Sequence, residues 1–131
     1  MADGGLVGHL GLVLDRVEND LAEGHLEVGP EHLQPYGVVH GGVYAAIAET
    51  LASIGAHTAA AARDPGGGVV GLENHTSFLR VARTGSTITA TARPRHAGRR
   101  VQLWSVVMRD ERGRELASST VRLLVVDPTS L

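Results

Sequence analysis

The sequence predicts an α+β domain in which one long central helix is wrapped by a curved antiparallel sheet of about six strands. The first observation is a run of 20 residues, 43–62, that is rich in alanine and holds a single formally charged side chain; this favours a helix with little exposure to solvent. The second is a set of β-type segments, two before that run and four after it. The third is that the later segments are joined by short connections, which favour antiparallel neighbours. Because one helix cannot cover both faces of such a sheet, we expect the sheet to curl around it and to leave an edge or outer face for a partner chain.

Turn signals set the bounds of the predicted elements. A Pro-containing turn at 30–35, with one helical turn at 31–33, separates the first strands from the helix. A loop of Arg, Asp, Pro and Gly at 63–68 ends the helix. The later strands are separated by turns that contain Gly, where a positive φ is expected. The predicted helix covers 42–62, and the predicted strands cover 10–17, 21–28, 69–81, 86–95, 101–110 and 115–126.

The composition indicates one domain over residues 1–131 and excludes several classes of function. The hydrophobic fraction is 43% but aromatic residues make up only 3%, so the core must be built from Val, Leu, Ile and Ala. A net charge of -2 provides no basic field for nucleic acid. The chain has no cysteine, which excludes disulfides and a thiol nucleophile. Its seven histidines show no His-Glu-x-x-His spacing, so we expect no metal. No cofactor is expected either.

No targeting segment or membrane span is expected. Residues 1–5 lack a basic region followed by an apolar run, which argues against a signal peptide. The segment 41–62 is long enough for a span, but it holds Glu49 and several polar side chains, and a carboxylate in mid-membrane is costly. We therefore expect a buried helix and a cytoplasmic protein.

The two faces of the predicted helix differ in side-chain size. At 100° per residue, one stripe carries large apolar side chains and is expected to face the sheet. The opposite face is small and nearly uncharged, whereas a face in water would carry Lys, Arg and several Glu. Since the chain has no other long helix to cover it, a second subunit is the expected partner. The large stripe consists of Val43, Ile47, Leu51 and Ile54, and the small face of Ala45, Glu49, Ala52, Ser53 and Ala56.

Glu49 is the one carboxylate of this helix, and a carboxylate is costly to bury without a partner or a function. The His40-Gly41-Gly42 turn before it supplies flexible backbone and free N–H groups at the helix start, where a negative oxygen can be held. Ser53 lies one turn after Glu49 on the same side. A solvated carboxylate beside a simple capping turn is the structural alternative. The combination favours acyl-transfer chemistry with an oxyanion at the helix N-terminus.

The segment 93–100 holds four arginines in eight residues. One interpretation is a solvated hairpin turn. The other is a contact for a phosphorylated ligand, because guanidinium groups match phosphate geometry. Arg80 and Arg83, at the end of another β segment, are candidates to join it.

The pattern Gln34-Pro35-x-Gly37-x-x-His40-Gly41-Gly42, followed by Glu49 and then Ser53, resembles the hotdog-fold acyl-CoA thioesterases. The resemblance continues through 74–78, Arg80, 96–98 and 109–114, and so covers nearly the whole chain from Leu10 onward. The chain is similar in particular to the Arthrobacter-type 4-hydroxybenzoyl-CoA thioesterases and the phenylacetate-pathway thioesterases.

This resemblance implies a homo-oligomer, usually a dimer of dimers, with active sites at the dimer interface and CoA as part of the substrate. It implies that Glu49 is the catalytic carboxylate and that the Gly41 amide polarises the thioester carbonyl. His40, Gln34 and Ser53 then orient the thioester, the acid or a water. Arg99 and Arg100 stand where the Arthrobacter pattern has small hydroxyl residues. The expected substrate-binding residues are Gly42, Arg80, His96, Gly98, Arg99 and Arg100.

The expected function is hydrolysis of an acyl-CoA with an aryl or phenylacetyl group, with Glu49 as nucleophile or general base. Two other classes stay open on the same fold. One is an enoyl-CoA hydratase or dehydratase, and the other is a non-catalytic acyl-CoA-binding domain.

Overall fold

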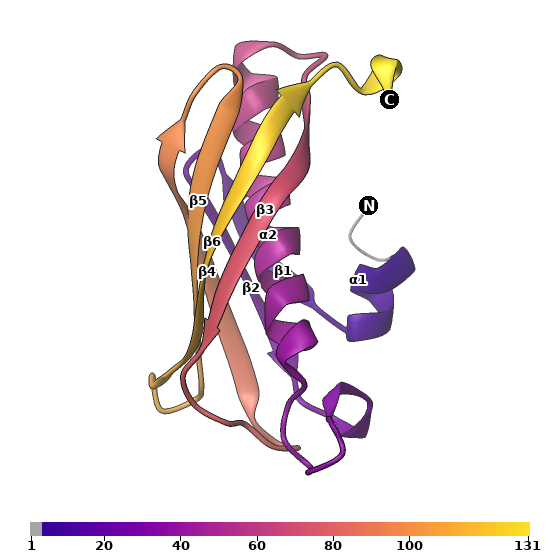
Figure 1. Cartoon of the computed structure of the whole chain (residues 1–131), viewed down its shortest axis with the longest axis vertical. Coiled ribbons are helices and arrows are strands. Elements are labelled where there is room, and N and C mark those ends of the chain that lie inside the picture. Colours follow the sequence, from indigo (N-terminus) through magenta and orange to yellow (C-terminus); the bar gives the residue numbers. More distant parts are fainter. Residues whose placement is uncertain (1–3) are drawn as a thin grey trace.

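The computed structural model describes residues 4–131, in which one long helix lies against a single six-stranded sheet (Figure 1). Residues 1–3, which begin the segment used for the signal-peptide prediction, lie outside the described residues. The described residues also form two short 3₁₀ helices: η1 comes before the long helix, and η2 follows the last strand. The elements in chain order are α1 (Gly5–Leu10), β1 (Val13–Glu18), β2 (Leu21–Glu27), η1 (Pro30–His32), α2 (Gly41–Arg63), β3 (Gly68–Phe78), β4 (Thr87–Ala97), β5 (Val101–Arg109), β6 (Glu115–Val126) and η2 (Pro128–Ser130).

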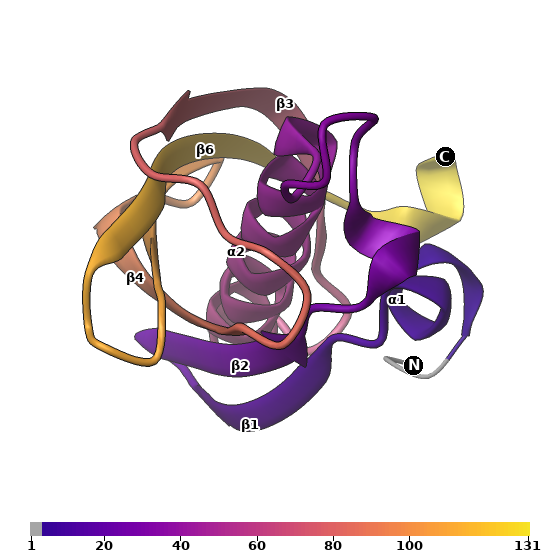
Figure 2. The same cartoon turned by 90° about the horizontal axis from the view of Figure 1, so that it is seen from below.

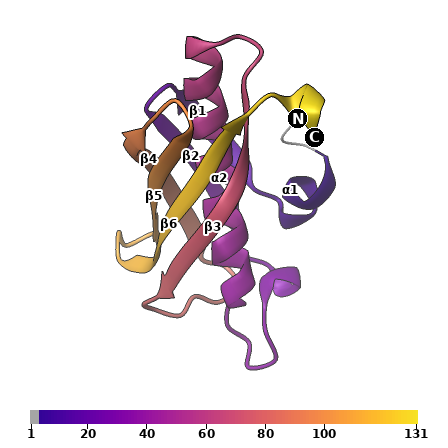
Figure 3. The same ribbon diagram turned by 45° about the horizontal axis from the view of Figure 1, so that its top comes forward.

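The sheet has the strand order β1-β2-β4-β5-β6-β3, and every neighbouring pair is antiparallel. Seen along the helix, the sheet curves around α2 (Figure 2). The predicted α+β architecture, with one central helix and a wrapped antiparallel sheet, is confirmed; it is the hotdog fold. The edge strands are β1 and β3, and β3 lies beside β6 and against α2 (Figure 3).

The predicted bounds of α2 and of all six strands are correct to within three residues. Helix α1 was not predicted, because six residues with two glycines are too few for a periodic signal. It ends at Gly11, which has a left-handed φ of 75°. The buried His32 of η1 holds this end: its Nε2 donates to the Leu10 carbonyl at 2.6 Å, and its Nδ1 accepts from the Gly29 N–H at 2.9 Å.

The sheet-facing stripe of α2 was predicted correctly at Val43, Ile47 and Leu51, which are buried in the core. It was wrong at Ile54, which is only partly buried. The core is aliphatic as expected, and its largest fully buried side chain is a single tryptophan, Trp104 of β5.

Ala52 and Ala56 were predicted to meet a second subunit, but both are fully buried inside the chain. Trp104 explains the difference, because a Cβ on Gly55 would clash with its indole ring. The absence of a side chain at Gly55, next to Ala56, therefore makes room for the tryptophan. Gln102 fixes it further, since Gln102 Oε1 accepts from Trp104 Nε1 at 2.8 Å and Gln102 Nε2 donates to the Ala56 carbonyl at 3.1 Å.

Candidate active site

Glu49 lies partly buried on the side of α2 that faces the edge strand β3. Ser53 Oγ donates to Glu49 Oε2 at 3.5 Å, and Asn74 Nδ2 of β3 donates to Oε1 at 3.3 Å. The strand comes so close at Gly71 that a Cβ there would collide with Oε2. A β-bulge between Gly71 and Glu73 interrupts the pairing of β3 with β6 at this point. Both oxygens of the carboxylate are thus held, one from its own helix and one from the sheet.

Asn74 belongs to this cluster, although the sequence analysis assigned it no role. Its Nδ2 also donates to the Ala45 carbonyl at 3.0 Å, and its Oδ1 accepts from Thr76 Oγ1 at 2.7 Å. Thr76 Oγ1 lies 2.6 Å from Ser119 Oγ of β6. Asn is disfavoured inside strands, so its presence within a β segment was the available signal.

Among the described residues, the start of α2 offers one free N–H group. His40 is the N-cap, and its Nδ1 accepts from the Gly42 N–H at 2.8 Å. The Gly42 N–H is therefore already engaged, whereas the Gly41 N–H has no acceptor among the described residues. In the part of the chain that the structure describes, the His40 ring forms a hydrogen bond with the helix start, whereas the hydrogen bonds of Glu49 come from Ser53 and Asn74.

A cavity of about 440 Å³ opens beside this helix start. It brings together three of the predicted site residues, Gln34, Gly41 and Arg80, and its wall is completed by apolar side chains and the rings of Tyr44 and Phe78. The Phe78 ring packs directly over Gly41, where a Cβ would clash with it. Glu49 does not line this cavity.

Tyr44 is a second residue that the sequence analysis missed. Its side chain is 3% exposed, and its hydroxyl has no hydrogen-bond partner among the described residues. Burial raises the pKa of Tyr44 to about 12. Its ring lies 6.1 Å from the Phe78 ring, so the two aromatic side chains form one wall.

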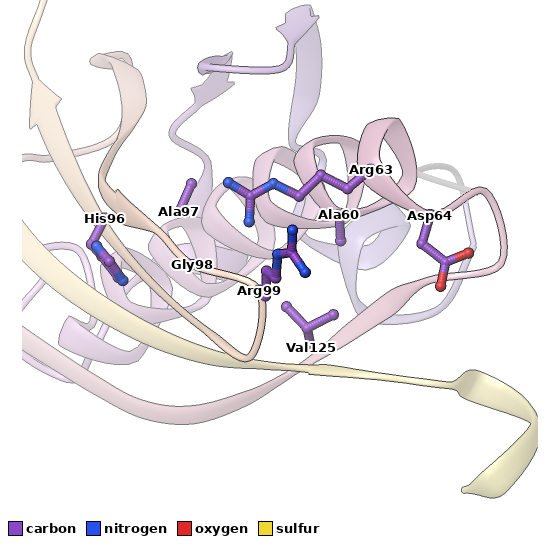
Figure 4. Close-up of a pocket in the computed structure, with 8 residues that line it drawn as sticks. All are labelled: Ala60, Arg63, Asp64, His96, Ala97, Gly98, Arg99 and Val125. Carbon is purple, nitrogen blue, oxygen red and sulfur yellow. The ribbon is translucent and has the colours of Figure 1, made fainter.

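A second cavity, of about 800 Å³, lies at the other end of α2 (Figure 4). The predicted residues His96, Gly98 and Arg99 line it, and Arg100 does not. Arg63, from the last turn of α2, also lines it and was not predicted. The cavity thus combines two guanidinium groups from separate elements.

One chain therefore holds the predicted site residues in three separate places. Gly41 and Glu49 are eight residues apart, or about 12 Å along the helix axis. Glu49 and Ala60, which borders the second cavity, are eleven residues apart, or about 16 Å along the axis. A single carbonyl group cannot reach the Gly41 N–H and the Glu49 carboxylate of the same chain.

Within residues 4–131, no helix combines the length and apolar character needed to cross a bilayer. The same part of the chain holds no group of three or more His, Asp or Glu side chains placed to bind a metal ion.

Comparison with known families gives a match to the thioesterase superfamily over residues 36–117. This range includes the helix start, Glu49, Asn74 and the turn of the second cavity.

Two relatives extend the match over most of the chain. Rv1847 of Mycobacterium tuberculosis is 44% identical over 114 residues, which are 87% of this chain and 81% of that protein. Its solved structure superposes with a TM-score of 0.86, covering 92% of this chain and 94% of the other. The proofreading thioesterase EntH of Cronobacter sakazakii is 37% identical over 123 residues, which are 94% of this chain and 87% of EntH.

The predicted similarity to the Arthrobacter-type and phenylacetate-pathway thioesterases is not supported by a comparable sequence identity. The PaaI protein of the E. coli phenylacetic acid degradation operon superposes with a TM-score of 0.82, covering 91% of this chain and 82% of that chain, but it is 21% identical. That likeness shows the fold alone.

Proposed function

The chain belongs to the thioesterase superfamily, and from this premise we propose that it hydrolyses the thioester of an acyl-CoA to the free acid and CoA. It is a thioesterase with the hotdog fold. The proposed catalytic carboxylate is Glu49, and the proposed acyl group is of the aryl or phenylacetyl type.

The observation that carries this proposal is the position of Glu49. It is held by Ser53 and Asn74, close to the β3 backbone, on a helix that has no other acidic side chain. A carboxylate in a fixed position beside a hydroxyl can act on a thioester carbonyl. CoA leaves as a thiolate without a strong general acid, so one carboxylate and one oxyanion donor suffice.

Two routes use the same carboxylate. In one, a Glu49 oxygen bonds to the carbonyl carbon, the C–S bond breaks, and water then hydrolyses the resulting anhydride. In the other, Glu49 takes a proton from a water whose oxygen bonds to that carbon. A single turnover in ¹⁸O-labelled water distinguishes them, because only the first route can leave label in Glu49.

The oxyanion donor in this proposal is the Gly41 N–H of a second copy of the chain. One such donor contributes about 3 kcal/mol or more to the transition state. Because Gly41 and Glu49 of one chain are about 12 Å apart along the axis, they can share a substrate only across two chains.

The edge strand β3 is the proposed contact between the two copies. It is 11 residues long, and its Leu72 and Phe78 are 53% and 59% exposed. A long edge strand with exposed apolar side chains favours pairing with another chain. Antiparallel pairing of two β3 strands would set the two α2 helices side by side in opposite directions. A two-fold axis near Ala45 would then bring Gly41 of one copy opposite Glu49 of the other.

Light scattering with a parallel activity assay tests this assembly. We expect at least a dimer, and a dimer of dimers by family resemblance, at micromolar concentration. An active monomer would contradict the two-chain site.

The cavity at the end of α2 is the proposed contact for the CoA phosphates. Arg63 and Arg99 present guanidinium groups there, which match phosphate geometry. We expect Arg99→Ala to raise the Michaelis constant for an acyl-CoA more than it lowers kcat. Arg100→Ala is the matched control, because Arg100 does not line the cavity. An equal effect of Arg99→Ala on an acyl-pantetheine, which lacks the nucleotide, would rule out phosphate recognition.

The acyl group is proposed to occupy the cavity beside the helix start, whose wall includes Tyr44 and Phe78. Aromatic side chains favour stacking with an aromatic acyl group. A hotdog protein of Streptococcus mutans, smu.793, has been solved with acetyl CoA, and at 21% identity it shares the fold with this chain.

The decisive experiment measures thiol release from benzoyl-, phenylacetyl- and medium-chain acyl-CoA. We expect release, with the highest kcat/KM for an aryl or phenylacetyl substrate. Water addition to an enoyl-CoA without thiol release would indicate a hydratase instead. Binding of all these thioesters without turnover would indicate a non-catalytic domain.

A further inference from the structure

Asn74 connects Glu49 to hydrogen bonds that run across the sheet. Ser119 of β6 and Thr76 of β3 are register partners, and their hydroxyl oxygens lie 2.6 Å apart. Thr76 Oγ1 is 2.7 Å from Asn74 Oδ1, and Asn74 Nδ2 reaches Glu49 Oε1 at 3.3 Å. Ser119 is 5% exposed, so this series of hydrogen bonds begins in the buried part of the sheet and ends at the Glu49 carboxylate.

The hydrogen bonds of this series can run in only one direction from donor to acceptor. Asn74 Nδ2 faces the Ala45 carbonyl and the Glu49 carboxylate, which both only accept, so the amide nitrogen must lie on this side. Asn74 Oδ1 must then accept from the Thr76 hydroxyl. Because that hydroxyl has a single hydrogen, Ser119 must donate to Thr76. Every donor in the chain therefore points toward Glu49.

Among residues 4–131, Asn74 is also the one residue of the sheet that forms a hydrogen bond with the carboxylate. The other donor, Ser53, lies on the same helix at 3.5 Å, the long limit of a hydrogen bond. A glutamate side chain has three rotatable bonds, and a contact from its own helix restrains them weakly.

We propose that Asn74 is a positioning residue for Glu49: with its amide oriented by Thr76 and Ser119, it holds the carboxylate against the β3 bulge in the position needed for attack. This inference rests on the proposed function of Glu49. Asn74 needs no contact with the substrate, so its effect should appear in kcat and not in substrate binding.

The test compares Asn74→Ala with Asn19→Ala, a matched control at the exposed turn between β1 and β2. We expect Asn74→Ala to lower kcat at least about tenfold with KM changed less than about twofold, because a small misplacement of a reacting group is costly. Asn19→Ala should keep the wild-type rate. If Asn74→Ala does not fold, Asn74→Asp keeps the shape and the Thr76 contact but replaces the donor by an acceptor, and it should also lose kcat.

A double variant separates positioning from a structural role. In the Glu49→Gln background, Asn74→Ala should change the residual rate less than about twofold, because the group it positions is already lost. An equal loss in both backgrounds would overturn the inference. Thr76→Val should lower kcat by several-fold, and Thr76→Ser, which keeps the hydroxyl, should restore it.

A crystal structure of Asn74→Ala gives a readout that does not depend on activity. We expect the Glu49 carboxylate to move away from Gly71. An unmoved carboxylate, or a kcat within twofold of wild type, would overturn the positioning role while leaving the thioesterase proposal intact. A wild-type protein that releases thiol from no thioester would instead contradict the proposed function.

Discussion

Two side-chain networks join the sheet to helix α2, and they end differently. In the C-terminal half of the helix, Gln102 bridges the Ala56 carbonyl and the Trp104 indole, and both side chains are fully buried. In the N-terminal half, Asn74 bridges the Ala45 carbonyl and the Glu49 carboxylate, which is only partly buried.

The difference separates support of the fold from preparation of a site. In the Gln102 network each side-chain donor atom has an acceptor within the protein, so the network is closed and serves packing. In the Asn74 network the last donor, Asn74 Nδ2, donates to the Glu49 carboxylate, which can accept several hydrogen bonds and keeps contact with solvent. Its last member is thus available to a ligand. The two networks should therefore respond in opposite ways to substitution.

The largest expected effect is on activity and comes from the Asn74 network, at Glu49. Glu49→Gln keeps the size of the side chain but removes the nucleophile or base, so we expect kcat for an acyl-CoA to fall at least about 100-fold. The thermal midpoint of unfolding should stay near that of wild type, because the amide still accepts from Asn74. Turnover within a few-fold of wild type would remove Glu49 from the mechanism.

The closed network should show the reverse pattern. Gln102→Leu leaves the buried Trp104 Nε1 without an acceptor, which costs about 1–3 kcal/mol in the free energy of unfolding. We expect kcat to stay within about threefold of wild type. Denaturant unfolding at one fixed protein concentration measures the change, because assembly also contributes to stability.

A double variant sharpens this result. In the Gln102→Leu background, Trp104→Phe removes the orphaned N–H. It should therefore lower the free energy of unfolding by less than Trp104→Phe does in the wild type. Equal costs in both backgrounds would show that the indole hydrogen bond contributes nothing.

The sequence allowed the fold to be predicted because its signals are local. The alanine-rich run, the Pro and Gly turns and the isolated Glu49 are all visible in short windows, and the structure has α2 and the six strands at these places. Ser53 was found by the same reasoning, since a spacing of four residues fixes its side of the helix.

The remaining site features depend on contacts between distant segments. Asn74 reaches Glu49 only because β3 pairs with β6 in one register and bulges at Gly71. Arg63 meets Arg99 at one cavity only because the end of α2 lies beside the turn between β4 and β5. No window of sequence contains these relations.

The error at Ala52 and Ala56 has a similar origin. Small residues on a helix indicate close packing, but they do not tell what packs there. Trp104, 49 residues after Gly55, packs against that glycine beside Ala56. A partner copy is instead proposed to meet the part of α2 near Ala45 and Glu49.

The smallest expected effect concerns Tyr44, a polar group on α2 that neither network reaches. Its buried hydroxyl lacks a partner among the described residues, so Tyr44→Phe should leave stability at neutral pH unchanged or raise it by up to about 1 kcal/mol.

The pH dependence of the stability of Tyr44→Phe gives a sharper test. Since burial raises the pKa of Tyr44 to about 12 from 10.0, the folded state keeps the proton that the unfolded chain loses first. Wild type should therefore lose stability relative to Tyr44→Phe as the pH rises from about 10 to 12, by roughly 2–3 kcal/mol in all. Denaturant midpoints measured for both proteins across this range test it. A parallel pH dependence of the two proteins would mean that the hydroxyl is not buried in solution, and a loss of more than about 1 kcal/mol in Tyr44→Phe at pH 7 would mean that it is hydrogen-bonded there.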